Sequence, residues 1–248
     1  MSKRKKLWID YIPAALAAVL IIFFAILKEQ SIIKTLPTLI TLAVQILLAR
    51  TSRFAFLLGG ANSVLYAISY YSEPLYFSAF FALFISMPIQ IYSYFNWKKN
   101  SNGDAPNIMS LPFYLKITTV IGIIITWIAF WKLLGNRIPS YQYPAIDSLI
   151  FTIGIITTVL SAIRFVDAQY FCIVSSTLSL VLWIMIVMKS PENINYVIIA
   201  LYNLFRGVEI TIAWSKRCHK NEKNLRNVDK TSLSTIRKDK TNEKKSFS

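Results

Sequence analysis

The chain has 248 residues, 55% of them hydrophobic, with a mean hydropathy of +0.49 and a formal net charge of +15. A water-soluble domain of this composition would expose much hydrophobic surface, so the composition favours a bilayer environment and argues against an ordinary soluble protein. The basic residues gather in Lys3–Lys6 and between Lys216 and Lys245. In a membrane protein such flanks are typical of cytoplasmic ends, and we expect no nucleic-acid partner.

Eight segments approach the length of about 20 mostly apolar residues that a membrane-spanning helix needs. We therefore expect an all-α integral membrane protein of about eight transmembrane helices. The first segment follows a basic cluster but is too long for the apolar core of a signal peptide, so we expect it to be retained. In chain order the expected spans are Leu7–Leu27, Ile32–Ala49, Phe54–Tyr71, Leu75–Phe95, Phe113–Leu134, Ala145–Ile163, Ala168–Met188 and Asn193–Ala213.

The charges of the connecting loops support this count. With the N-terminus inside, 21 of the 27 Lys and Arg residues fall inside and five outside, and Arg206 lies within the last span. This asymmetry follows the positive-inside rule and predicts a multi-pass protein with both termini in the cytoplasm. The tail beyond His219 is polar and basic, and we expect it to be disordered or to lie against anionic lipid headgroups.

Two parts of the chain match each other. Arg50 follows the second expected helix and Arg164 the sixth, and each segment then ends in a tryptophan with basic neighbours, at Trp97 and Trp214. This pattern predicts two three-helix units of the same orientation joined by an odd linker helix, with chance similarity as the alternative. The expected organisation is an N-terminal basic cluster and extra helix (1–29), a first unit (30–99), a cytoplasmic loop and linker helix (100–140), a second unit (141–217) and a basic cytoplasmic tail (218–248).

No motif for catalysis or metal binding is present. The sequence has no phosphate-binding GxxxxGK[ST], no GxSxG and no HExxH. Its only cysteines are Cys172 and Cys218, and its single histidine, His219, lies in the tail. This set forms neither a disulfide framework nor a zinc site, so we expect no enzyme, no cofactor and no metal.

Polar residues at membrane depth are instead the expected lining of a solute pathway. In the first half, Asn62 and Tyr66 are four residues apart and share one face of a helix. They are candidates for binding a hydroxylated solute, with hydrogen bonding between helices as the alternative. Gln90, behind Pro88, either lines the path or satisfies backbone groups that the proline leaves unpaired.

In the second half, Gln169, Cys172 and Ser176 form a stripe on one helix face, and Trp183 continues it. We expect the stripe to bind solute. Trp183 would stack on a planar ring or would anchor the helix at the membrane interface.

The last span carries Asn203, Arg206 and Glu209 at intervals of three, so Arg206 and Glu209 can form an ion pair. They are candidates for solute contact, and the alternative is that both side chains extend toward the cytoplasm. Asp147 opens the sixth expected helix and is expected to cap its N-terminus.

With these elements in place, the chain resembles the PnuC family of bacterial vitamin-precursor transporters. The resemblance covers roughly residues 30–216 and rests on FLLGGANSVLY (Phe56–Tyr66), PLY (Pro74–Tyr76), MPIQIYSYFNWKKN (Met87–Asn100), Asp147 and Arg164. It implies a SWEET-like 3+1+3 parallel repeat preceded by an extra N-terminal helix. It also implies facilitated uptake of nicotinamide riboside, which a separate kinase then traps for pyridine nucleotide biosynthesis.

Nicotinamide riboside members of that family share a WxxWxxxN stripe, and the matching positions here are Gln169, Cys172 and Ser176. Thiamine, riboflavin and other nucleosides therefore remain alternative solutes. A proton- or sodium-coupled carrier that uses Glu209, and a sensor that transports nothing, are the other classes. The expected setting is the bacterial plasma (inner) membrane, and the expected partners are a vitamin or nucleoside solute, the lipid bilayer and, in a homo-oligomer, further copies of the chain.

Overall fold

The computed structural model describes residues 3–99, 101–102, 105–133, 137 and 141–246, and almost all of them are helical. A two-stranded antiparallel hairpin, β1 (Ser101–Asn102) and β2 (Ala105–Pro106), interrupts the helices. The helical elements in chain order are α1 (Lys3–Leu27), α2 (Ile32–Ala49), α3 (Phe54–Ser72), α4 (Tyr76–Phe80), the π-helical turn η1 (Phe81–Ser86), α5 (Met87–Lys99), α6 (Phe113–Leu133), α7 (Pro144–Ala162), α8 (Asp167–Val187), the 3₁₀ turn η3 (Pro191–Asn193) and α9 (Ile194–Ser246).

Six helical segments of the described chain are long and apolar enough to cross a membrane, and Tyr11–Leu27 is a shorter apolar helix. One of the six, Tyr76–Lys99, combines α4, η1 and α5. Helix α3 has a comparable length but is more polar, because it carries Asn62, Ser63 and Ser69. The expectation of an all-α, multi-pass membrane protein with about eight helices is confirmed. The expected end of the fifth span, Leu134, lies outside the described residues.

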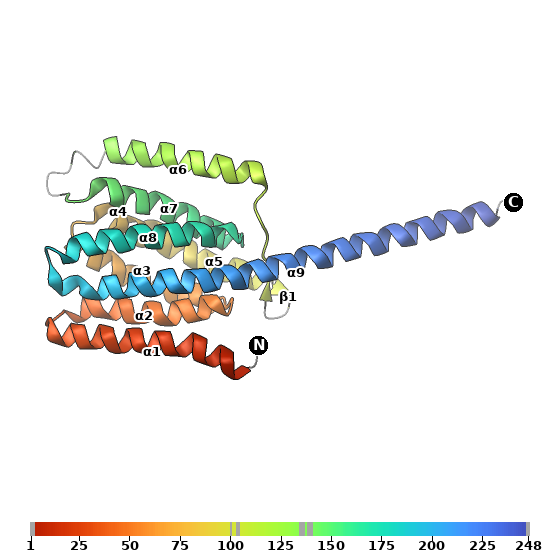
Figure 1. Ribbon diagram of the computed structural model, residues 1–248. Helices are drawn as coiled ribbons and strands as arrows, with labels where there is room; N and C mark the ends of the chain where they lie inside the picture. The colour runs from red at the N-terminus through yellow and green to blue at the C-terminus, as the bar shows by residue number, and fades with distance from the viewer. Residues whose placement is uncertain (1–2, 100, 103–104, 134–136, 138–140, 247–248) are drawn as a thin grey trace.

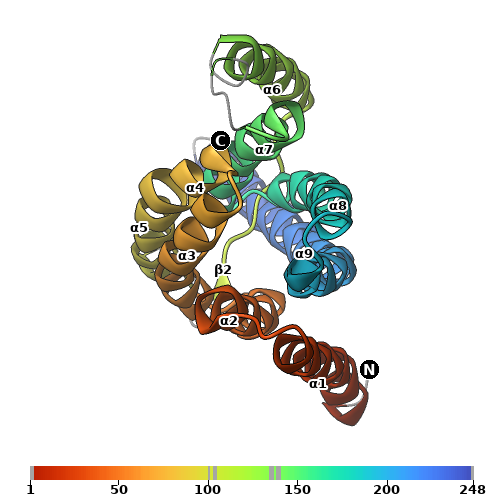
Figure 2. The same ribbon diagram turned by 90° about the vertical axis from the view of Figure 1, so that its left-hand side faces the viewer.

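Six helices form a ring around a central axis (Figure 2), and this set includes α3 and excludes α6. The ring runs in the order α2, α3, α5, α7, α8 and α9, and α9 contacts α2 to complete it. Helix α1 packs outside the ring against α2 and α9, and α6 packs outside it against α7. Each of the two expected three-helix units would supply half of this ring, although the division of the chain into units remains a prediction.

The two ends of the ring differ in charge. The start of α1, the β hairpin and the extension of α9 lie at one end (Figure 1), where α5 also finishes with Lys98 and Lys99. We call this the basic end. The turns between α1 and α2, between α3 and α4, and between α8 and α9 lie at the opposite, distal end.

Helix α9 continues far beyond the ring (Figure 1). It is one helix of 53 residues that reaches Ser246. The expectation of a disordered tail is therefore wrong, and the alternative of contact with anionic lipid headgroups stays a prediction. That expectation rested on the low apolar content of the tail, which limits burial but not helix formation, and no proline or glycine after Gly207 ends the helix.

Helices α2 and α7 end in the same way at the basic end. Each is followed by a left-handed residue, Thr51 (φ 54°) and Arg164 (φ 69°). The N–H groups of that residue and of the next return to the helix in a Schellman motif. The four hydrogen bonds join Thr51 N to Leu48 O (2.8 Å), Ser52 N to Leu47 O (2.9 Å), Arg164 N to Ser161 O (3.1 Å) and Phe165 N to Leu160 O (2.9 Å). In these motifs Thr51 matches Arg164, so the sequence match of Arg50 with Arg164 is one residue out of register.

Candidate solute-binding cavity

Two adjoining cavities lie inside the ring, of about 330 Å³ toward the basic end and about 280 Å³ toward the distal end. They share the lining residues Thr41, Tyr66, Tyr70, Phe81, Ser86, Thr157, Thr158, Cys172 and Asn203, and we describe them together as the cavity. Leu48, Phe56 and Ser161 line it toward the basic end, and Trp183 and Tyr196 line it toward the distal end. Among the described residues that line this space, none is charged.

Thr41 of α2 connects two of the predicted site residues. Its Oγ1 donates to the carbonyl of Pro37 (2.8 Å), and it lies 2.8 Å from Tyr66 Oη and 3.0 Å from Asn62 Nδ2. Asn62 Nδ2 also donates to the Pro37 carbonyl at 3.0 Å. Because the Thr41 proton is used on Pro37, Thr41 accepts from both neighbours. Asn62 and Tyr66 therefore tie α3 to α2, as the alternative reading expected, while both also line the cavity.

Gln90 reaches the cavity across a glycine. Its Nε2 donates to Ser63 Oγ (3.0 Å) and to Ser86 Oγ (2.7 Å). A Cβ on Gly59 would lie 2.1 Å from Gln90 Oε1, so a side chain at this position would have to displace the amide. Ser86 belongs to the π turn η1 just before Pro88, which has no N–H to donate. A π turn inside a helix is often found at functional sites, and here its last residue, Ser86, lines the cavity.

The stripe on α8 faces the cavity as expected. Gln169, Cys172 and Ser176 all line it, Gln169 being buried. Ser175 and Ser179 line the same wall. Asn203 of the neighbouring helix α9 also lines the cavity and accepts a hydrogen bond from Gln45 Nε2 at 3.0 Å. Among the described lining residues this wall therefore offers hydroxyl, amide and thiol groups and no charged group.

Four aromatic rings surround the distal part of the cavity, and we call them the aromatic collar. Trp183 stacks on Tyr196 with ring centroids 4.0 Å apart, and Tyr66 stacks on Tyr70 at 5.2 Å. Tyr70 to Trp183 (6.0 Å) and Tyr66 to Tyr196 (6.4 Å) complete the set. Trp183 is only 4% exposed, which does not fit the alternative of a lipid-facing anchor.

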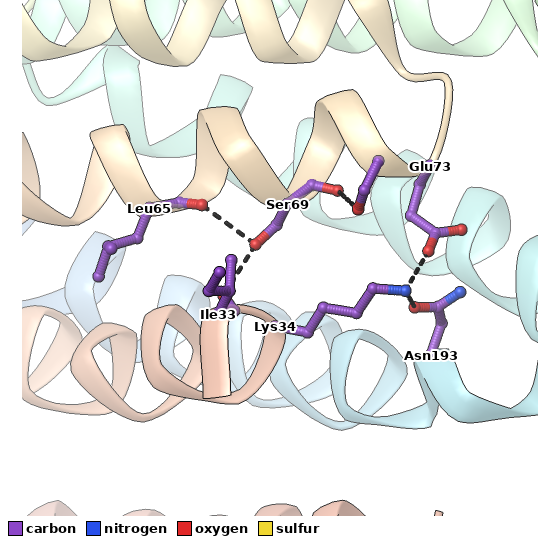
Figure 3. Close-up of polar contacts among 7 residues, drawn as sticks. Ile33, Lys34, Leu65, Ser69, Glu73 and Asn193 are labelled. Atoms are coloured by element: carbon purple, nitrogen blue, oxygen red, sulfur yellow. Dashed lines mark hydrogen bonds and ion pairs between the residues drawn. The ribbon is translucent and has the colours of Figure 1, made fainter. Parts of the chain in front are cut away.

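Beyond the collar, a polar network joins the elements of the distal end (Figure 3). Lys34 Nζ of α2 lies 2.5 Å from Glu73 Oε1, just after α3, and donates to Asn193 Oδ1 of η3 at 3.2 Å. Ser69 Oγ bridges α3 and α2 by bonding to the carbonyls of Leu65 and Ile33, each at 3.0 Å. One lysine thus connects α2, α3 and the start of α9.

Asp147 makes a second distal connection. It is fully buried, and its carboxylate accepts hydrogen bonds from Ser78 N (3.4 Å), Ser78 Oγ and Tyr141 Oη. Burial and the nearby Asp147 carboxylate raise the pKa of Tyr141, so its phenol keeps the proton that it donates. The expectation that Asp147 caps its own helix α7 is wrong, because the carboxylate bonds to the first turn of α4 instead.

Arg206 and Glu209 pair as their spacing predicted, with Arg206 Nη1 2.5 Å from Glu209 Oε2. Arg206 is fully buried, whereas the Glu209 side chain is 29% exposed. Neither residue is among those that line the two cavities. Solute contact by this pair therefore has no support from the geometry.

At the basic end, Trp97 and Trp214 meet with ring centroids 5.3 Å apart, and we call them the tryptophan pair. Trp97 Nε1 donates to the carbonyl of Ser161 at 3.0 Å, and Trp214 Nε1 to that of Leu48 at 3.5 Å. Ser161 and Leu48 hold the same position in the two Schellman motifs. The last helix in each half of the ring thus binds the first helix of the other half in the same way.

The family of the chain follows from a comparison with known proteins. A family model described as nicotinamide mononucleotide transporter matches residues 31–216, the segment that builds the ring and α6. The chain belongs to this family. Its fold is similar to that in a crystal structure of the vitamin B3 transporter PnuC, with a TM-score of 0.75 at 17% identity over 89% of this chain and 94% of that one. No curated protein sequence matches.

Membership of this family confirms the resemblance inferred from the sequence and makes the protein a transporter by class. Eight of the ten predicted site residues line the cavity, though their part in solute binding stays a prediction. Sequence reasoning missed the roles of Thr41, Gly59 and the hydroxyl pair Thr157 and Thr158. A paired glycine and paired threonines inside apolar helices were the available signals, since such residues allow close packing or offer hydroxyls to a cavity.

Proposed function

We propose that the protein is a facilitator for an unphosphorylated vitamin precursor, with nicotinamide riboside as the first candidate. The observation that carries this proposal is the polar but uncharged cavity inside the ring of a chain from the nicotinamide mononucleotide transporter family. A phosphate group is bound by arginine, lysine or the N–H groups of a helix N-terminus. Because no charged side chain is among the lining residues, a riboside fits better than the phosphorylated mononucleotide.

The lining supports a division of roles. The amides of Asn62, Gln90, Gln169 and Asn203 and the hydroxyl of Ser176 would hydrogen-bond the sugar and the carboxamide. Cys172 would pack against the solute, and Tyr66 and Trp183 would contact the planar ring. Arg206 and Glu209 would brace α9 rather than touch the solute. Thiamine or another nucleoside remains the alternative, because Gln169, Cys172 and Ser176 replace the aromatic stripe of the nicotinamide riboside members.

Transport would follow from movement of two three-helix units, α2 to α5 and α7 to α9, with α6 as the linker helix. Parallel units related by a pseudo-twofold axis along the membrane normal would alternately open each end of the cavity. The matching Schellman motifs and the reciprocal indole bonds of the tryptophan pair support this relation between the units.

The distribution of basic residues also supports an orientation of the protein in the membrane. The basic end, with Lys98, Lys99 and the long basic α9, would face the cytoplasm according to the positive-inside rule. We propose the plasma membrane of a bacterium as its location. In a homo-oligomer, the exposed faces of α1 and α6 would be available for contact between copies.

Uptake of labelled solutes decides the proposal. Cells that lack their own vitamin carriers and express the protein should accumulate nicotinamide riboside, and nicotinamide mononucleotide should compete poorly. Gln169→Leu should reduce uptake about tenfold or more, because it leaves polar solute groups unpaired. Ile125→Ala on the exposed face of α6 is the matched control and should leave uptake unchanged. No uptake of any nucleoside or vitamin would overturn the proposal.

Ion coupling is the second candidate function, with Glu209 as its only carboxylate inside the last span. Its pairing with Arg206 and its position outside the cavity lining disfavour it. We expect initial uptake to survive collapse of the proton and sodium gradients. A full loss of uptake on such collapse, together with an inactive Glu209→Gln variant, would establish coupling.

A further inference from the structure

The segment between β2 and α6, residues 107–112, lies at the basic end of the ring, and two of its side chains, Ile108 and Leu111, are buried. We call it the linker segment. Ile108 is only 1% exposed and packs in one cluster with the tryptophan pair, Phe56, Val166, Ile210 and Cys218. Its neighbour Met109 is 42% exposed. Loops usually run over the surface, so a buried isoleucine between two helical halves indicates a specific position.

Main-chain pairing fixes the linker segment to the turn between α7 and α8. Met109 N donates to Arg164 O at 3.0 Å, and Val166 N donates to Met109 O at 2.9 Å. This pairing forms a parallel bridge between Met109 and Phe165. The segment that leaves the first half of the ring is thereby attached to the second half.

Asp167 holds the linker segment with both carboxylate oxygens. Its Oδ2 accepts the backbone N–H of Leu111 at 2.6 Å, and its Oδ1 lies 2.7 Å from Lys116 Nζ. Asp167 is buried, whereas the Lys116 side chain is 41% exposed. Leu111 is itself buried against Leu160 and Ala168. One carboxylate at the start of α8 therefore secures the end of the segment and the first turn of α6.

The cavity reaches this cluster from the other side. Phe56 belongs both to the cavity lining and to the cluster around Ile108. The carbonyls of the lining residues Leu48 and Ser161 are those that accept the indole N–H groups. Separation of the tryptophan pair at this end would therefore have to displace Ile108 as well.

We propose that the linker segment is a plug for the basic end of the cavity, with Ile108 as its stopper and Asp167 as its latch. The plug rests on the proposed transport through the cavity, because it matters only if solute leaves at this end. Ile108 and Asp167 then control the rate of exchange without touching the solute. Weakening the latch should raise the fraction of molecules whose cavity is open at the basic end.

Two native thiols report on this opening without any solute. Cys172 lines the cavity, and Cys218 is buried in the cluster around Ile108. In membrane vesicles that expose the basic end, a charged maleimide should label Cys172 of a Cys218→Ser chain slowly. Asp167→Asn and Ile108→Ala should each raise that labelling rate about tenfold, because they shift the local opening equilibrium. Ile125→Ala, the same deletion on the lipid-facing side of α6, should not change it.

Lys116→Met distinguishes a latch from general damage. It removes the ion pair but keeps the Leu111 N–H bond to Asp167, so its labelling rate should fall between those of the parent and Asp167→Asn. Detergent-solubilised samples of each variant should elute as the parent does, which separates opening from misfolding. If Asp167→Asn and Ile108→Ala label Cys172 at the parent rate in well-behaved samples, the plug is refuted.

A cross-linking experiment tests the link to transport. A chain with Ile108→Cys and Cys172→Ser should be joined by a short reducible bis-thiosulfonate between residue 108 and Cys218. Uptake should fall after cross-linking and return on reduction, with its own uncross-linked rate as reference. Unchanged uptake in the cross-linked chain would overturn the plug. Absence of uptake by the unsubstituted parent chain would count against the proposed function, while the labelling experiment would still decide the plug.

Discussion

The two ends of the cavity are closed by different chemistry. At the basic end the tryptophan pair, Ile108 and Phe56 form an apolar cluster around two indole hydrogen bonds. At the distal end an ion pair, Lys34 with Glu73, and the buried Asp147 carboxylate lie outside the aromatic collar. Water can replace polar contacts when a gap opens, whereas an opened apolar cluster exposes surface with no compensation. The distal end adds these polar contacts to an apolar cluster of its own, in which Trp183 and Tyr196 pack with Leu75, Leu182 and Ile186.

Both ends nevertheless use one plan of contacts. At the distal end Lys34 of α2 reaches Asn193 before α9, and Asp147 of α7 reaches Ser78 of α4. At the basic end Trp214 of α9 reaches α2, and Trp97 of α5 reaches α7. At the basic end, both contacts are made by a tryptophan. At the distal end, the corresponding contacts are made by a lysine on α2 and by an aspartate on α7. The contacts thus connect corresponding helices at both ends, although the residue types differ at the distal end.

The largest effect is expected from removing a member of the tryptophan pair. Trp97→Ala and Trp214→Ala should each lower the unfolding free energy by about 3 kcal/mol, because each leaves a cavity in a packed cluster. Similar losses in the two variants would support equivalent roles for the two tryptophans in the two halves of the ring. Thermal or denaturant unfolding in detergent measures this, with Phe113→Ala, 78% exposed on α6, as the control. A loss of stability in only one of the two variants would contradict equivalent roles for the two tryptophans.

The distal ion pair should give a smaller and rescuable effect. Lys34→Met or Glu73→Gln alone leaves a partly buried charge without its partner, which should cost about 1–2 kcal/mol of stability. The double variant should recover most of that loss, since no unpaired charge remains. A double-mutant cycle in unfolding and in uptake rate measures the coupling. If the double variant is as impaired as the sum of the singles, the two side chains do not act as a pair.

How far the sequence predicts this molecule depends on which property fixes each feature. Apolar length gave the spans, and loop charge gave the common end of the termini, because both follow from the bilayer as solvent. Helical periodicity placed the Gln169 stripe on the cavity wall. The partner of Asp147 could not be read in this way, because Ser78 and Tyr141 reach it only through the packing of α4 against α7. The burial of Ile108 could not be predicted either, because a loop has no periodic pattern of apolar residues.

Alanine substitutions at two glycines distinguish the effect of close packing at the cavity from the effect of helix propensity. Gly59→Ala should lower stability by about 1 kcal/mol, because the new Cβ would displace the Gln90 amide from Ser63 and Ser86. Gly122→Ala on α6 meets nothing within 4 Å and should be neutral or slightly stabilising. Unfolding of both variants in detergent provides the measurement, and uptake by Gly59→Ala reports the role of Gln90. Equal behaviour of the two variants would show that Gln90 is not held by this close approach.

The smallest effect is expected from the long extension of α9, although α9 also supplies Trp214 to the apolar cluster of the basic end. Among the residues whose side chains the structure describes, Trp214 and Cys218 are the last of α9 in the apolar cluster, and a chain that stops after Lys220 retains both. We expect its unfolding free energy to change by less than about 0.5 kcal/mol, as for surface changes in general, and its uptake to stay near the parent rate. A chain that stops before Trp214 is the contrasting variant and should lose the closure. If the shorter deletion alone abolished uptake in a normally folded protein, the extension would act on the basic end directly, and the closure there could no longer be described by the tryptophan pair and the linker segment alone.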